Sequence, residues 1–448
     1  MFHEKKGRYF KACLFFALVL IMTARYFSVL SLSFDITSER FPNSMIAASI
    51  MNLDMSEQQF GLHLLSCDNI IYDGLGKDSI SGIKKINDGT LYLVYHSPEF
   101  ANKNVQIAST RLQQYGIQGW IVYYLSLAWH LVSGKISPQY WYFMLRALFI
   151  SLMAIVLTAV SFQIYKAYDI LFAASFYCVC LTSTWLTNFA PNLYWASFTW
   201  FMPMLFSLMC MNSKRAKILP YFMVSASVAF KSLCGYEYLS VVMMCAIAFP
   251  LSEYLSCTKL ETLRKRKMFK ITLGIGLSAL VGFIATFAFH AWLLGKGNIM
   301  NGLSRILYDT HALQRIGFSE DVDPSTKSIT VILARYLLPP SGWYVLCIFI
   351  ISLLSIRCAK IKHNIPVRQG VCLLLLSLCS SLSWFILARN HSYVHIHINH
   401  VLWVMPFMPT ALYVFLKYRI MTLIPAPEKY NTFINSVCSF VKSIFWLS

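Results

Sequence analysis

The sequence has few charged residues, and acidic residues are the scarcer kind. Only 13% of its 448 residues are Asp, Glu, Lys or Arg, whereas 57% are hydrophobic, and the mean hydropathy is +0.56. A soluble domain of ordinary composition has about a quarter charged residues, so this much apolar surface requires lipid to cover it. The composition excludes an ordinary soluble domain and predicts an integral membrane protein.

Several motifs of soluble enzymes are missing as well. The 13 cysteines form no CxxC pair and no Cys/His spacing typical of a zinc site, and most of them lie in apolar runs as small apolar residues. The sequence contains no glycine-rich phosphate loop, no internal repeat and no low-complexity segment. The lack of repeats argues against a transporter built from inverted repeats.

Apolar runs alternate with short basic segments along the chain. Ala12–Leu32, Phe143–Ile164 and Ile271–Leu294 each reach the roughly 20 residues that a helix needs to span a hydrocarbon core. The formal charge of +19 comes largely from basic clusters between such runs, which the positive-inside rule places in the cytoplasm. The charge therefore does not require nucleic acid as a partner, and the sequence predicts an all-α polytopic membrane protein.

The basic clusters also predict which connections share a side of the membrane. A cluster over residues 5–11 precedes the first run and places the N-terminus in the cytoplasm. Further cytoplasmic clusters lie within residues 214–217, 264–267 and 357–368. The connections expected on the opposite, outer side are Asn188–Trp195, Cys234–Tyr238, Gly295–Pro340 and Arg389–His400.

One apolar stretch, Gly116–Leu131, does not fit this alternation of sides. We expect it to form a helix in the membrane interface, because a crossing there would violate the charge rule and because it is rich in Trp and Tyr. The alternative is an eleventh span with an exceptional topology. The sequence thus predicts one membrane domain over 1–448 with about ten spans, both termini cytoplasmic, a first outer loop over 34–139 that includes the interfacial helix, and a second over 295–340.

A carboxylate follows the first apolar run directly. Asp35 is expected at the outer membrane boundary, where partial desolvation raises the pKa of a carboxyl group and a helix end fixes its direction. Both properties suit a general base. The alternative is an ordinary acidic residue next to a span.

Several cations are expected at or near the outer boundary. Arginine inside a membrane segment is costly and usually faces protein, water or an anion, so Arg146 is a candidate contact for a phosphate. The alternative is that its side chain extends to the nearby interface. The residues 389–400 contain four of the 11 histidines, and Arg and imidazole groups donate hydrogen bonds to anionic oxygens, which favours phosphate over a metal ion. The candidate phosphate contacts are Arg146, Arg335, Arg389, His391 and His395.

Two other outer turns combine amide, aromatic and charged side chains. Amides form hydrogen bonds with sugar hydroxyls, and aromatic rings stack on the C–H faces of sugars. The alternatives are an aromatic belt at the interface and a simple ion pair between Lys231 and Glu237. The candidate substrate contacts are Asn188, Asn192, Tyr194, Trp195, Lys231, Glu237 and His397.

This pattern resembles the GT-C superfamily of membrane glycosyltransferases, which includes protein mannosyltransferases, aminoarabinose transferases and O-antigen glucosyltransferases. The resemblance rests on one span, an outer acidic motif of Asp35 with Glu39, a long first outer loop with an interfacial helix, and Arg146 near the outer end of the next span. It covers roughly the first half of the chain. The adjacent acidic pair common in protein mannosyltransferases is Asp35-Ile36 here, so the motif assigns no subfamily.

The resemblance implies that a sugar is moved from a polyprenyl-phosphate donor to a glycan, lipid or protein acceptor. Asp35 would deprotonate the acceptor, with Glu39 as the second candidate catalytic residue. No nucleotide sugar or other cofactor is required, and a divalent metal stays an open alternative. The expected location is the bacterial inner membrane, with the chemistry at the periplasmic face. The alternatives are an O-antigen or capsule polymerase and a polysaccharide flippase or other transporter. In a polymerase the longest outer loop more often lies late in the chain, whereas here it comes first. A transporter is expected to have charged residues deep in several spans.

Overall fold

The computed structural model describes residues 2–28, 43, 45–67, 105–133, 138–213, 218–315, 328–424, 432 and 436, and most of this part is helical. The helices are α1 (Phe2–Phe27), α3 (Ala47–Ile50), α5 (Ile117–Ser133), α6 (Pro138–Ala167), α7 (Ile170–Thr182), α8 (Thr184–Phe189), α9 (Phe198–Asn212), α10 (Ile218–Cys234), α11 (Leu239–Ser256), α12 (Thr262–Leu294), α13 (Ile299–Arg315), α14 (Ile329–Leu337), α15 (Pro340–His363), α16 (Arg368–Leu387), α17 (Arg389–Val394), α18 (Ile396–Asn399), the 3₁₀ helix η4 (His400–Val404) and α19 (Phe407–Leu423). The strands are β1 (His63–Cys67) and β2 (Val105–Thr110).

Six helical segments among the described residues are long and apolar enough to cross a membrane. They are Tyr140–Ala167, Leu239–Ser256, Thr262–Leu294, Gly342–His363, Arg368–Leu387 and His400–Leu423. Helices α7, α9 and α10 are shorter apolar helices. These segments confirm a multi-pass helical membrane protein, whereas the number of about ten spans, the inner membrane and the orientation of the termini stay predictions.

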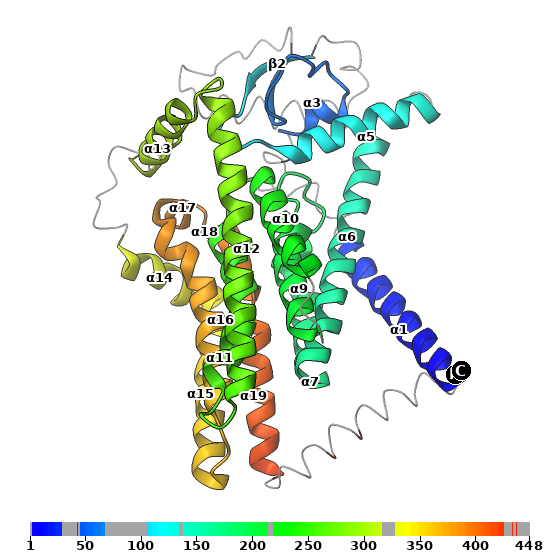
Figure 1. Ribbon diagram of the computed structural model, residues 1–448. Helices are drawn as coiled ribbons and strands as arrows, with labels where there is room; N and C mark the ends of the chain where they lie inside the picture. The colour runs from blue at the N-terminus through cyan, green and yellow to red at the C-terminus, as the bar shows by residue number, and fades with distance from the viewer. Residues whose placement is uncertain are drawn as a thin grey trace.

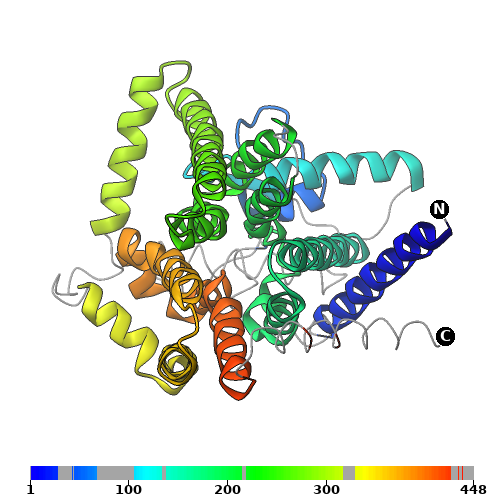
Figure 2. The same ribbon diagram turned by 60° about the horizontal axis from the view of Figure 1, so that its bottom comes forward.

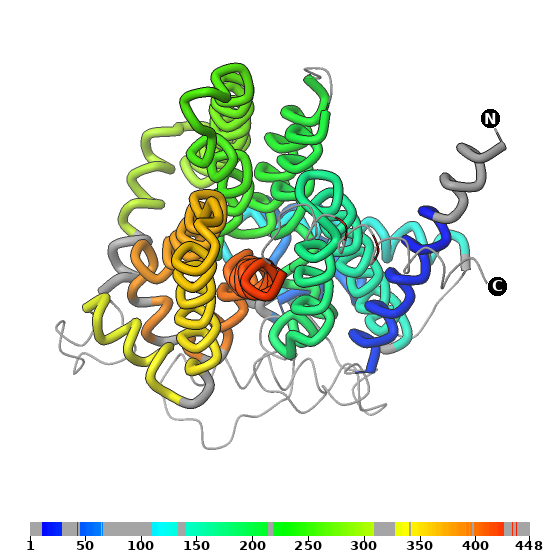
Figure 3. The backbone as a smooth tube through the Cα atoms, turned by 90° about the horizontal axis from the view of Figure 1, so that it is seen from below, coloured from blue at the N-terminus to red at the C-terminus, as the bar shows by residue number. Residues whose placement is uncertain are grey.

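The axes of the long helices lie roughly parallel to one another, and the connections between these helices lie at the two ends of the bundle (Figure 1). We call the end that holds the α11–α12 and α15–α16 turns the inner end, and the end that holds α5 and α13 the outer end. Helix α19 packs between α7 and the pair α15 and α16, as the view from below shows (Figure 3). The ring of Tyr413 on α19 stacks on Phe172 of α7 with centroids 4.3 Å apart. α19 therefore joins the two sides of the bundle.

A small unit formed by α3, the β1–β2 sheet and α5 covers part of the outer end (Figure 1). The two strands pair antiparallel, which adds a short sheet to the expected helical architecture. α5 crosses close to the residues before β1, since a Cβ on Gly119 would lie 1.7 Å from the carbonyl oxygen of Gly61. α5 also runs across the direction of the long helices (Figures 1 and 2), as expected for a helix in the interface. Its position in a bilayer stays a prediction.

A buried histidine forms the terminal pair of the two strands, opposite Thr110. His63 Nδ1 lies 3.2 Å from Thr110 Oγ1, and the Thr110 hydroxyl donates to Gln58 Oε1 at 2.9 Å. Because that hydroxyl proton is directed to Gln58, Nδ1 of a neutral His63 donates to Thr110. Burial without a partner charge lowers the pKa of His63 from 6.5 to about 4.

Acid is therefore expected to destabilise this outer unit. The unfolded segment binds a proton on His63 near pH 6.5, whereas the folded segment does so only near pH 4, so stability is lost as the pH falls through this interval. At about pH 5 the loss is about 2 kcal/mol. Limited proteolysis of the chain in nanodiscs between about pH 7 and pH 5 measures it. The His63→Gln variant should be cleaved at a rate independent of pH in this range, and an equal acid response of both proteins contradicts the assignment.

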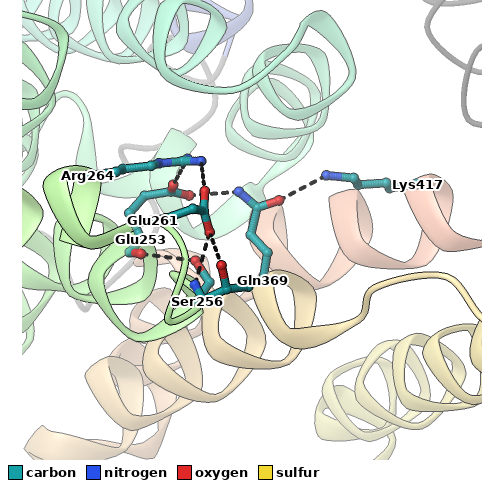
Figure 4. A network of polar contacts seen from close by, with 7 residues as sticks. Glu253, Ser256, Glu261, Arg264, Gln369 and Lys417 are labelled. Atoms are coloured by element: carbon teal, nitrogen blue, oxygen red, sulfur yellow. Dashed lines mark hydrogen bonds and ion pairs between the residues drawn. The ribbon is translucent and has the colours of Figure 1, made fainter.

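A network of polar side chains ties four helices together near the inner end (Figure 4). Glu253 of α11 accepts hydrogen bonds from Arg264 of α12 and from the Gln369 amide of α16, the latter at 2.7 Å. Lys417 of α19 donates to Gln369 Oε1 at 3.2 Å. Arg264 also contacts Glu261, which lies at the exposed edge of the network.

The two carboxylates around Arg264 provide a matched test of this network. The side chain of Glu253 is 6% exposed and that of Glu261 is 38% exposed. Glu253→Ala removes the buried carboxylate that receives hydrogen bonds from both Arg264 and the half-buried Gln369, and is expected to destabilise the protein by about 1–3 kcal/mol. Glu261→Ala removes a solvated contact and should shift the unfolding midpoint much less. Thermal unfolding of the purified variants in detergent measures the difference, and equal shifts of the two midpoints contradict a stabilising role for the buried network.

Candidate functional site

The turn between α8 and α9 is shaped by asparagine side chains. Asn192 Oδ1 accepts from the backbone N–H groups of Tyr194 at 3.0 Å and Trp195 at 3.2 Å, and Asn43 Oδ1 accepts from Leu193 N at 3.0 Å. Asn192 was a candidate sugar contact, but its buried side-chain oxygen is used to form the turn. Asn188 lies half-buried in α8.

The turn between α10 and α11 meets this first turn through a cluster of polar side chains. The hydroxyl of Tyr194 donates to Glu237 Oε1 at 2.9 Å. The Gln114 amide lies 2.9 Å from the same hydroxyl, and its nitrogen lies 3.0 Å from Glu237 Oε2 in the orientation that satisfies both groups. The buried Lys231 donates to the carbonyl oxygen of Gly235 at 2.6 Å, and its charge acts on Glu237 without forming a direct ion pair. The structure thus brings Tyr194, Lys231 and Glu237 together.

The start of α5 is bound to both turns. Gln118 donates from one nitrogen to the carbonyl oxygens of Tyr194 at 2.9 Å and Cys234 at 3.0 Å. Gln114 and Gln118 were not among the predicted site residues. Their signal in the sequence is a pair of amides at the edge of an otherwise apolar stretch; Gln118 is in the first turn of α5, and Gln114 precedes that helix.

Aromatic rings pack next to this polar cluster. Trp195 stacks on Tyr238 with centroids 5.4 Å apart and planes 10° apart, and Trp200 meets the same ring edge-on at 5.2 Å. Tyr238 has φ +62°, which costs of order 1–3 kcal/mol for a residue other than glycine and persists only where the surroundings impose it. Such strain is concentrated at functional sites, and here it directs the Tyr238 ring between the two tryptophans.

Tyr238 connects this cluster to the histidine-rich segment. Its hydroxyl donates to Asn399 Oδ1 at 2.7 Å, and the Asn399 amide donates to the Tyr336 hydroxyl at 3.0 Å. The Tyr336 hydroxyl in turn donates to the carbonyl oxygen of Ser392 at 2.6 Å. A continuous line of hydrogen bonds therefore runs from the α10–α11 turn to α17.

Three of the predicted phosphate contacts meet around α17. The guanidinium carbon of Arg335 on α14 lies 4.2 Å from the ring centroid of Tyr393, and its Nη1 donates to the Tyr393 carbonyl oxygen at 3.3 Å. The rings of His391 and His395 lie 4.5 Å apart. Trp384 Nε1 donates to His391 Nδ1 at 3.3 Å, so the proton of a neutral His391 is on Nε2. Guanidinium and imidazole groups donate hydrogen bonds to anionic oxygens, and all three groups belong to or contact the same short segment, α17 and its C-terminal residue His395.

The other predicted phosphate contacts are placed differently. Arg389 begins α17 and is exposed, with Nε donating to the Ile386 carbonyl oxygen at 3.3 Å. Arg146 is buried on α6 with its guanidinium carbon 5.3 Å from the Tyr142 ring centroid. Because α6 and α14 lie on opposite sides of the bundle (Figures 1 and 2), the structure does not bring Arg146 to Arg335. His397 lies in α18, and its side chain is outside the described residues.

The predicted carboxylates Asp35 and Glu39 lie outside the described residues. The chain is described again at Asn43, whose side chain is bound to the α8–α9 turn. Asn43 therefore lies beside the turn that carries Tyr194.

Burial changes the pKa values of two tyrosine hydroxyl groups in the site. It raises the pKa of Tyr194 and of Tyr336 above the ordinary value of 10.0. Both hydroxyls consequently stay protonated at neutral pH and act as donors to Glu237 and to Ser392. The described part of the chain contains no group of three or more His, Cys, Asp or Glu residues that could hold one metal ion.

Comparison with known proteins adds no assignment. No family model, curated protein or solved structure matches the chain. The chemistry of the site is therefore inferred from its own residues.

Proposed function

We propose that the protein is a membrane glycosyltransferase of the GT-C type, which moves a sugar from a polyprenyl-phosphate donor to a glycan, lipid or protein acceptor at the outer face. One observation carries the proposal. Residues from the two outer turns form a single cluster with Gln114, and hydrogen bonds join that cluster to the segment of Arg335, His391 and His395. An amide- and aromatic-rich part suited to a sugar thus lies next to a cationic part suited to a phosphate.

Each part has a role in the proposed reaction. Asp35, or Glu39 in its place, takes the proton of the acceptor hydroxyl, and the acceptor oxygen attacks the anomeric carbon. The bond between that carbon and the phosphate oxygen breaks, and the polyprenyl phosphate leaves with the electron pair. Arg335, His391 and His395 stabilise the charge that develops on the leaving phosphate, with Arg389 at the rim.

The sugar ring is expected at the Tyr194–Glu237 cluster. Glu237 accepts hydrogen bonds from hydroxyl groups, and the buried rings of Trp195 and Tyr238, which stack on each other, hold the turn that carries it. Lys231 lies buried behind the turn, where its amino group donates to the Gly235 carbonyl. Lys231 therefore acts on the substrate through Glu237 and the turn.

Binding of the lipid alone tests the proposal before the sugar is known. The full chain in nanodiscs is titrated with a short-chain polyprenyl phosphate and with the polyprenol of equal length. The proposal predicts saturable binding of the phosphate lipid only, weakened in the Arg335→Gln variant. Equal binding of both lipids, or unchanged binding by the variant, contradicts the assignment of the cationic part.

A further inference from the structure

Helix α13 belongs to the predicted second outer loop, and the proposed reaction does not use it. It follows α12 after a four-residue turn and folds back beside the outer end of that helix (Figures 1 and 2). The backbones touch there, because a Cβ on Gly302 would lie 1.7 Å from the carbonyl oxygen of Ala291. This approach fixes the direction of α13 relative to a predicted span.

One face of α13 is apolar and remains uncovered. Met300 is 68% exposed and Leu307 is 53% exposed, and residues seven apart lie on the same side of a helix. Arg305 is exposed about 140° around the helix from Met300, and the exposed Asn301 lies between the two directions. An amphipathic helix with this division of side chains is typical of a water–membrane boundary.

The end of α12 marks where that boundary lies. Phe289 stacks on Trp292 with centroids 6.4 Å apart and packs edge-on against Tyr115 at 5.3 Å. Trp292 is 46% exposed, and Trp and Tyr concentrate at the level of the lipid headgroups. α12 is one of the helices apolar enough to span the membrane, so α13 begins at the edge of the bilayer. The exposed Lys296 in the connecting turn and Arg305 match the negative charge of lipid phosphates.

We propose that α13 binds the outer surface of the bilayer, with Met300 and Leu307 in the acyl region and Lys296 and Arg305 at the phosphates. The outer loop is then a membrane-bound element, and this holds whether or not the protein transfers sugar. Because α13 also packs against α17, the bilayer surface on this side lies next to the segment of His391 and His395.

Site-specific photocrosslinking tests the proposal with a matched pair of positions. Leu307→p-benzoylphenylalanine and Arg305→p-benzoylphenylalanine are made separately in the full chain, which is placed in nanodiscs of phosphatidylethanolamine and phosphatidylglycerol. After irradiation, mass spectrometry should find lipid adducts at position 307 and only background at position 305. No adduct at 307, equal adducts at both positions, or crosslinking at 307 to a second copy of the chain overturns the proposal.

A second measurement uses the unmodified protein and so does not depend on folding of the variants. The nanodiscs then contain a phospholipid with a photoreactive group on one acyl chain close to its carbonyl end, at the depth an interfacial helix reaches. Labelling of α13 on the side of Met300 and Leu307 is expected, and absence of label from α13, with label present on α12, overturns the proposal.

Discussion

Asp35→Asn is expected to lower sugar transfer by at least about a hundredfold while the protein accumulates normally in the membrane. The substitution keeps the size and hydrogen-bonding capacity of the side chain but removes the basic carboxylate. Stability should change by no more than about 0.5 kcal/mol, as for an ordinary surface substitution. Sugar transfer per amount of membrane protein, from cells that express each variant, measures the effect.

Asp54→Asn is the matched control for this substitution. Asp54 is an exposed aspartate of the same outer segment, and its Oδ1 accepts from the backbone of Ser56 at 2.9 Å, a contact that Asn preserves. Its activity should be unchanged. Near-normal transfer by Asp35→Asn shifts the assignment to Glu39, and if Glu39→Gln is active as well, neither carboxylate is the base.

Arg335→Gln is expected to reduce turnover by about 100- to 1000-fold, the range for loss of one preorganised group that stabilises developing charge. The substitution keeps a polar amide, but the positive charge near the leaving phosphate is lost. Steady-state kinetics at saturating donor lipid separate turnover from binding. Arg335→Lys, which keeps the charge and loses the planar guanidinium, should recover part of the rate.

Arg266→Gln serves as the matched control, because Arg266 is exposed at the inner end. It should retain full activity and the same thermal stability. If Arg335→Lys is as inactive as Arg335→Gln while both fold normally, the charge is not what matters. If both are fully active, the cation does not serve the donor phosphate.

The sequence predicted the helical membrane architecture because burial in lipid leaves a strong compositional signal. Apolar runs such as Phe143–Ile164 and Ile271–Leu294 lie within α6 and α12, whereas the basic run 264–267, predicted as a loop between spans, belongs to the first turns of α12. The sequence also selected Tyr194, Lys231 and Glu237, which the structure joins. Polar residues at the ends of apolar helices are visible in a sequence because they interrupt its hydrophobic pattern.

Contacts between distant segments could not be predicted in the same way. Gln114 and Gln118 join the site because Gly119 lets α5 cross close to Gly61, a tertiary approach without a local pattern. Asn192 resembles a sugar ligand in the sequence, but its role in the turn depends on the backbone directions of Tyr194 and Trp195.

The lipid-linked and surface glycans of cells with and without the protein test the central claim most directly. The comparison includes cells that produce the Asp35→Asn variant. We predict that cells lacking activity accumulate one polyprenyl-phosphate sugar and lose that sugar from a glycan, lipid or protein, whereas the wild-type chain restores it. An unchanged profile contradicts the account. So does a change in glycan chain length with intact sugar composition, which indicates a polymerase, or retention of complete lipid-linked units inside the cell, which indicates a flippase.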